Sequence, residues 1–88
     1  MTSRRFAPTH PIAVVAVPSG APVRFRWRGR WWRVAAILAT WEIEADWWLG
    51  PPAAVARRYH RLRTTDGLLC VAYRDQHTDH WFLEQITD

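Results

Sequence analysis

The chain has 88 residues, a formal net charge of +4 and 49% hydrophobic residues, with seven tryptophans among them. This length holds one small domain, and so high an aromatic content argues against disorder. A single cysteine excludes an internal disulfide, and no apolar run approaches the roughly 20 residues of a membrane-spanning helix, so we expect a soluble cytoplasmic protein with no membrane partner.

The first residues differ in composition from the rest of the chain. Residues 1–11 contain two prolines and show no periodicity, so we expect a flexible arm there. Residues 12–88 then form a single small β domain. Its first element is a β-branched run over 12–17, which ends at the turn cluster 18–20 and is typical of an edge strand.

The next strand alternates strictly between apolar residues and arginine. Val23, Phe25 and Trp27 are separated by arginines, and a period of two residues is typical of a strand with one buried face. Gly29 follows where a tight turn is needed. The β pattern resumes at Arg30 and continues to about residue 44.

The length of the turn at Gly29 decides which side chains share a face. A two-residue turn places Phe25 and Trp27 on the same inner face as Trp32 and Val34. A three-residue turn would instead bring arginine among these apolar residues, so burial favours the two-residue turn. Four side chains then share the outer face: Arg24, Arg26, Trp31 and Arg33.

The middle of the chain interrupts the strand pattern and then returns to it. Residues 53–58 follow two prolines and form either one helical turn or a loop. Asp66-Gly67 lies between two β-like runs and predicts a hairpin. A two-residue turn at this point pairs Leu62 with Val71.

The last strand covers residues 81–87, and its register is ambiguous. Trp81 and Leu83 compete with Phe82 and Ile86 for the inner face. The chain thus contains five or six short antiparallel strands. The predicted fold class is all-β, either a small curled sheet or an SH3-like barrel, because closure hides strand edges that otherwise attract other chains.

Charge is distributed unevenly along the chain. All 12 basic residues are arginine, and the seven within residues 1–33 have no acid among them. Residues 34–56 contain three acids and no base, whereas residues 57–88 contain five of each. An asymmetry of this kind indicates a polyanion or an acidic surface as partner.

The predicted outer face joins arginine with tryptophan, and this combination suits a nucleic acid. Arginine pairs with phosphate through two hydrogen bonds, and an exposed Trp31 offers a stacking platform for an unpaired base. We therefore take four residues as the candidate nucleic-acid site: Arg24, Arg26, Trp31 and Arg33. The competing interpretation is a solvated face on which the arginine stems cover the indole.

Trp47 and Trp48 are adjacent, so in a strand they point to opposite faces. Their functional interpretation is a partner-docking anchor, because exposed tryptophan often dominates a protein interface. The alternative is that one or both close the end of the barrel, since a core this small needs large side chains.

Other site chemistries find little support in the sequence. His77 and His80 lie in a polar loop but lack a second pair of ligands, so we expect no metal. Cys70 lies mid-strand, and in the predicted register His60 faces the other side, so no base activates the thiol. We expect no catalytic residues, no enzymatic activity, no cofactor and no small-molecule substrate.

From Arg30 onwards, aromatic, arginine and Asp-Gly motifs follow one another in a distinctive order. They are Arg-Trp-Trp-Arg-Val (30–34), Trp41, Trp47-Trp48, Arg57-Arg58-Tyr59, Thr65-Asp66-Gly67, Tyr73-Arg74-Asp75, Thr78, His80-Trp81-Phe82-Leu83 and Ile86-Thr87-Asp88. Over roughly residues 24–88 this order resembles a small uncharacterised bacterial domain family that is common in actinobacteria. A similar segment ends the catalytically inactive Y-family polymerase homologue of the actinobacterial mutasome, which supports error-prone translesion synthesis.

The chain departs from the pattern of that family at three places. It has Tyr59-His60 where the family usually has two tyrosines, and Thr87-Asp88 where the family has Tyr-Asp. It also has Asp79 where the family has glycine, which predicts a changed loop because aspartate tolerates a positive φ less well.

The resemblance implies a non-enzymatic accessory role in DNA repair. Together with the arginine-rich face, it leads us to expect weak binding of single-stranded or damaged DNA. The alternative is a protein-interaction module that docks on an error-prone polymerase or another repair protein, with a mutasome polymerase subunit as its partner.

Overall fold

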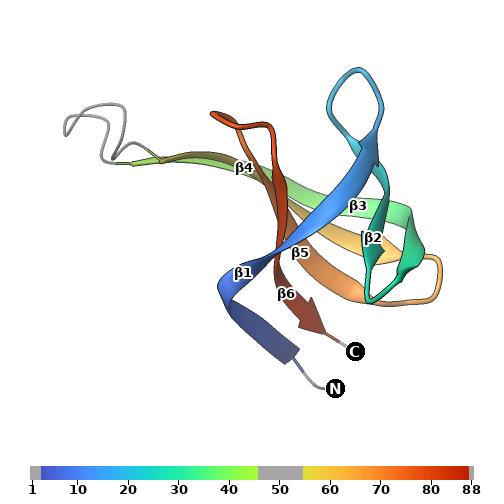
Figure 1. Cartoon of the computed structure of the whole chain (residues 1–88). Helices are drawn as coiled ribbons and strands as arrows, with labels where there is room; N and C mark the ends of the chain where they lie inside the picture. The colour runs from blue at the N-terminus through green and yellow to red at the C-terminus, as the bar shows by residue number, and fades with distance from the viewer. Residues whose placement is uncertain (1–2, 46–54, 88) are drawn as a thin grey trace.

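The structure is a computed structural model that describes residues 3–45 and 55–87. Its six strands run antiparallel in sequence order and close into a barrel, which confirms the predicted all-β class (Figure 1). The strands are β1 (Ser3–Ala16), β2 (Pro22–Trp27), β3 (Arg30–Ala45), β4 (Val55–Thr64), β5 (Leu69–Asp75) and β6 (Trp81–Thr87).

The two longest strands close the barrel because each pairs with both of its neighbours along different parts of its length. β1 pairs with β6 over residues 3–12 and with β2 over residues 13–16. β3 pairs with β2 over residues 30–33 and with β4 over residues 34–45. Figure 1 shows β1 and β6 crossing, with the two chain ends close to each other.

The predicted flexible arm is wrong for residues 3–11, which belong to β1. Ser3 lies opposite Thr87, and the pairing continues to Pro11 opposite Phe82 with one register shift between Arg5 and His10. The irregular stretch contains Pro8, and proline, which has no N–H, is tolerated at such bulges. The absence of periodicity therefore reflects a bulged strand that closes the barrel.

The two-residue turn between β2 and β3 is confirmed. Trp27 pairs with Arg30, and the two residues between them, Arg28 and Gly29, have φ angles of 52° and 74°. Positive φ at both central positions is the geometry of a type I′ turn, which matches the natural twist of the strands.

The hairpin between β4 and β5 forms where it was predicted, but its register differs. Leu62 pairs with Cys70 instead of Val71, because the connection has three residues. The Gly67 N–H donates to the Thr64 carbonyl at 3.0 Å, and Gly67 has a φ of 85°. A β-turn followed by a left-handed glycine is the usual three-residue hairpin connection.

A bulge resolves the ambiguity in β6. Val71 pairs with Gln85 and Ala72 with Leu83, so Glu84 has no partner of its own on β5. The extra residue brings Leu83 and Ile86 to the same inner side, where both are fully buried.

The core occupies the barrel interior, and its buried residues come from β2, β4, β5, β6 and the β4–β5 turn. Phe25 and Trp27 are buried, as the alternation predicts, whereas Val23 at the end of that face is 40% exposed. Trp32 and Val34 pack against the core from its rim and are only partly buried. The buried cluster consists of Phe25, Trp27, Leu62, Leu68, Cys70, Ala72, Leu83 and Ile86.

A row of aromatic rings crosses the outside of four strands. Trp41 stacks on Tyr59 at 5.4 Å between ring centres, Tyr59 contacts Tyr73 at 5.0 Å, and Tyr73 contacts Phe82 at 5.2 Å. Each ring lies directly opposite the next on neighbouring strands. Cross-strand pairs of this kind stabilise a sheet, so the row reinforces β3 to β6.

The possible helical turn at residues 53–58 is wrong for the part that the structure describes. Residues 55–58 already belong to β4, and residues 53 and 54 lie outside the described ranges. Within those ranges, nothing helical is present that could serve as a membrane span.

Candidate nucleic-acid interface

The four residues of the predicted site come together on the outside of the β2–β3 hairpin. Arg24 lies opposite Arg33, and Arg26 lies opposite Trp31, so all four share one face. Their neighbours Phe25 and Trp27 point into the core, which turns these side chains outward. All four are exposed, and we call them the arginine face.

The guanidinium of Arg24 lies over the ring of Trp31 and leaves the indole partly exposed. Its side chain is 44% exposed, and the guanidinium carbon of Arg24 lies 5.2 Å from the centre of its ring. A cation this close to an indole is attracted by the ring's negative face. An ordered indole with free surface is a suitable platform for stacking a base.

The arginine face keeps its positive charge free for a ligand. No carboxylate in residues 3–45 and 55–87 lies within 4.0 Å of a guanidinium nitrogen of Arg24, Arg26 or Arg33. The ion pairs that the described residues do form involve other arginines: Arg30 with Asp66, Arg58 with Glu42, and Arg74 with Asp79.

Two further arginines extend the basic surface across β4, and the sequence analysis missed them. Arg61 and Arg63 are exposed and alternate with the buried Leu62 and Thr64, so they also point outward. The guanidinium carbon of Arg61 lies 5.9 Å from the ring centre of Trp41, which repeats the arginine-beside-tryptophan arrangement of the arginine face. The signal was their alternation with Leu62 and Thr64 in the sequence.

The two arginines near the start of the chain, Arg4 and Arg5, lie on a different pair of strands. Arg4 and Arg5 pair through their backbone with Ile86 and Gln85 of β6, so they belong to the β1–β6 seam. The predicted docking residues Trp47 and Trp48 lie outside the described residues.

His60 and Cys70 both point into the barrel, which corrects the predicted separation of the two. The register places Leu62 opposite Cys70 and His60 opposite Ala72, so these side chains share the inner face. Burial raises the pKa of the Cys70 thiol to about 12, which disfavours the reactive thiolate. In the described ranges, His77 and His80 are exposed, and no group of three His, Cys, Asp or Glu gathers as metal ligands.

Comparison with known protein families identifies the family to which the chain belongs. A family described as "Domain of unknown function (DUF6504)" matches residues 2–88. The chain belongs to this family. Neither a curated protein nor a solved structure matches it.

Proposed function

We propose that this DUF6504 domain binds single-stranded or damaged DNA weakly, as a non-enzymatic accessory domain in DNA repair and translesion synthesis. The observation that carries the proposal is the arginine face, where three arginines without carboxylate partners in the described ranges surround an exposed tryptophan. Arg61 and Arg63 continue the same surface across β4.

The chemistry of this face suits an unpaired strand. Guanidinium groups bind phosphate oxygens and release condensed counterions, which supplies affinity that carries no sequence information. Trp31 adds base stacking, which requires that the base be free of its partner strand. Single-stranded and damaged DNA offer both groups at once, whereas intact duplex hides the faces of its bases.

The repair context rests on the resemblance of residues 24–88 to the C-terminal segment of the inactive Y-family polymerase homologue of the mutasome. An accessory domain in translesion synthesis works where a template strand is exposed. Weak phosphate-directed binding is sufficient there, because attachment to an assembly raises the effective concentration of the strand.

Binding of a labelled thymidine oligonucleotide, followed by fluorescence anisotropy at about 50 mM salt, tests the proposal. Arg33→Gln removes one phosphate contact, and we expect it to weaken binding roughly fivefold or more at this salt concentration. Arg74→Gln is the matched control, because it removes the same charge from an arginine that is paired with Asp79. Equal losses in the two variants, or no binding by the parent protein, would contradict the proposal.

A second candidate function is docking on an error-prone polymerase subunit. The observation that favours it is the exposure of Leu38, the most exposed of the large apolar side chains of β3. Leu38→Asp places a charge on a side chain that is 48% exposed, so the fold is spared. A polymerase subunit that binds the parent protein and this variant equally well would rule out docking through Leu38.

A further inference from the structure

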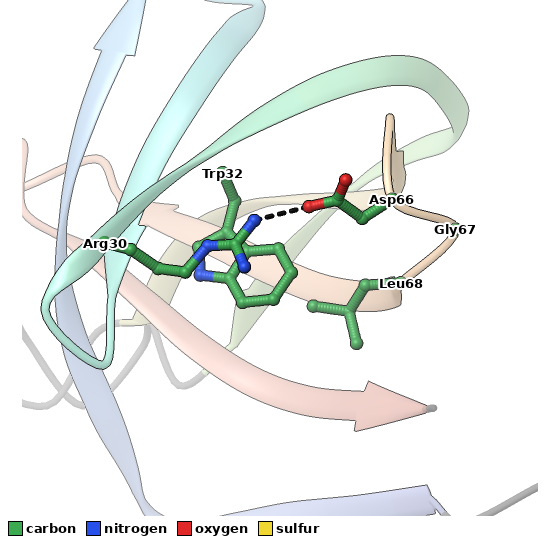
Figure 2. A pocket seen from close by; sticks show the side chains of 5 residues that line it. All are labelled: Arg30, Trp32, Asp66, Gly67 and Leu68. Atoms are coloured by element: carbon green, nitrogen blue, oxygen red, sulfur yellow. Dashed lines mark hydrogen bonds and ion pairs between the residues drawn. The ribbon is translucent and has the colours of Figure 1, made fainter.

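An open pocket lies between the β2–β3 and β4–β5 turns, beside the end of the arginine face. Its volume is about 460 Å³, within the range of small-molecule sites, which runs from about 300 to 1,000 Å³. Figure 2 shows the residues that line it: Arg30, Trp32, Asp66, Gly67 and Leu68.

Hydrogen bonds fix the walls of this pocket. The Trp32 Nε1–H donates to the Trp27 carbonyl at 3.1 Å, which orients the indole. The Thr65 N–H donates to the Arg33 carbonyl at 3.0 Å, which ties the turn carrying Asp66 to β3. The pocket therefore has a positioned ring and a positioned carboxylate before any ligand binds.

Arg30 forms one wall of the pocket, and its contacts show what chemistry Trp32 and Asp66 accept. Its guanidinium carbon lies 3.8 Å from the centre of the Trp32 ring, and its Nη2 pairs with the Asp66 carboxylate. Figure 2 shows the planar group lying over the indole with one edge toward the carboxylate. Both members of this ion pair are 55% exposed, so the pair contributes little stability and opens readily.

We propose that this pocket binds an unpaired guanine base, which replaces the guanidinium of Arg30 on Trp32. Guanine carries two adjacent in-plane donors, N1–H and the N2 amino group, on its Watson–Crick edge. These match the two oxygens of the Asp66 carboxylate, which only accepts hydrogen bonds. The inference rests on the proposed function and adds recognition of one base to it.

The other bases present a less suitable edge to a carboxylate. Adenine and cytosine each place an acceptor nitrogen beside their amino group, and thymine flanks its single N–H with two carbonyl oxygens. Each of these acceptors would face a carboxylate oxygen and repel it. Arg30, once displaced, is exposed at the pocket and is available for the phosphate of the bound nucleotide.

Titration with the four deoxynucleoside monophosphates, followed by the NMR signal of the Trp32 Nε1–H, tests the inference. We expect the guanine nucleotide to bind at least about fivefold more tightly than the adenine nucleotide, as a good bidentate contact provides. Asp66→Asn abolishes this preference. Asp79→Asn is the control, since it removes a carboxylate from the distant Arg74 pair, and it should keep the preference.

The source of the base and the proposed function are tested separately. A thymidine oligonucleotide with one guanine binds more tightly than the all-thymidine strand if the base comes from a DNA strand, whereas equal binding indicates a free guanine nucleotide as ligand. Equal affinity for guanine and adenine nucleotides, or an Asp66→Asn variant that keeps the preference, overturns the guanine pocket. Binding of the all-thymidine strand would still support the arginine face in that case.

Discussion

His60 is a titratable residue that is buried in the barrel. Its side chain is 3% exposed, its ring stacks on Trp81, and its Nδ1 lies 3.1 Å from the Thr40 Oγ1. Its Nε2 is buried and has no hydrogen-bond partner within the described residues. Burial, with the positive charge of Arg58 added, lowers the pKa of His60 below its ordinary value, so the ring is neutral in the folded barrel.

The lowered pKa of His60 makes stability depend on pH. Below a pH of about 6.5 the unfolded chain binds a proton that the folded barrel resists, so the free energy of unfolding falls as pH falls. The decline amounts to at most about 1.4 kcal/mol per pH unit for one group. Urea unfolding at pH 7.5 and pH 5.5 measures it.

The matched variants for this prediction are His60→Gln and His77→Gln. His60→Gln removes the buried titrating group and should flatten the pH dependence, whereas His77→Gln changes an exposed loop residue. A His60→Gln variant with the full pH dependence of the parent would contradict the assignment.

Burial also predicts how much each aromatic residue of the β2–β3 hairpin contributes to the free energy of unfolding. Phe25 is 1% exposed at the centre of the core, so Phe25→Ala should cost about 3–5 kcal/mol of unfolding free energy. Trp32 packs at the rim, so Trp32→Ala should cost less although its side chain is larger. Denaturant unfolding measures both losses. A larger loss of unfolding free energy for Trp32→Ala than for Phe25→Ala would contradict the position of Phe25 at the centre of the core.

At the level of the strands, alternation predicts a register well when no bulge interrupts it. β2 and β3 follow the predicted pairing from Arg24 to Arg33 because each position alternates and Gly29 suits a type I′ turn. That pairing alone was sufficient to locate the arginine face. Period-two patterns thus identify an outer face directly from the sequence.

Bulges and turn length account for what the sequence could not predict. Asp66-Gly67 suits both a two-residue and a three-residue connection, and only burial of Leu68 and Cys70 together selects the second. The bulge at Glu84 depends on the partner strand. The pocket lined by Trp32 and Asp66 was missed because these residues come together only once β3 and β4 are paired.

The β4–β5 turn provides a test at this level. Gly67→Ala keeps the space, since nothing lies within 4 Å of the added Cβ, but it forces alanine to a φ of 85°. We expect a loss of about 1–2 kcal/mol in unfolding free energy from the left-handed backbone alone. Thr65→Ala, at an exposed position of the same turn, is the control. An unchanged unfolding free energy for Gly67→Ala would contradict the turn geometry.

At the scale of the whole molecule, the arginines of the first third of the sequence lie on different parts of the folded barrel. Arg4 and Arg5 lie at the β1–β6 seam, whereas Arg61 and Arg63, from the last third of the chain, are exposed on β4, which pairs with β3. Asp79 shows a local compensation, because it holds a φ of 61° and pairs with Arg74 at 2.7 Å. The basic surface is therefore a product of topology as well as of composition.

The salt dependence of DNA binding tests the central claim most directly. Three phosphate contacts by Arg24, Arg26 and Arg33 predict a slope of log K against log salt near −2, at about −0.7 for each contact on a single strand. Each Arg→Ala change should flatten the slope by about one contact, and Trp31→Ala should weaken binding with the slope nearly unchanged, because stacking displaces no counterions. A slope that the arginine changes leave untouched would show that this face is only a solvated surface.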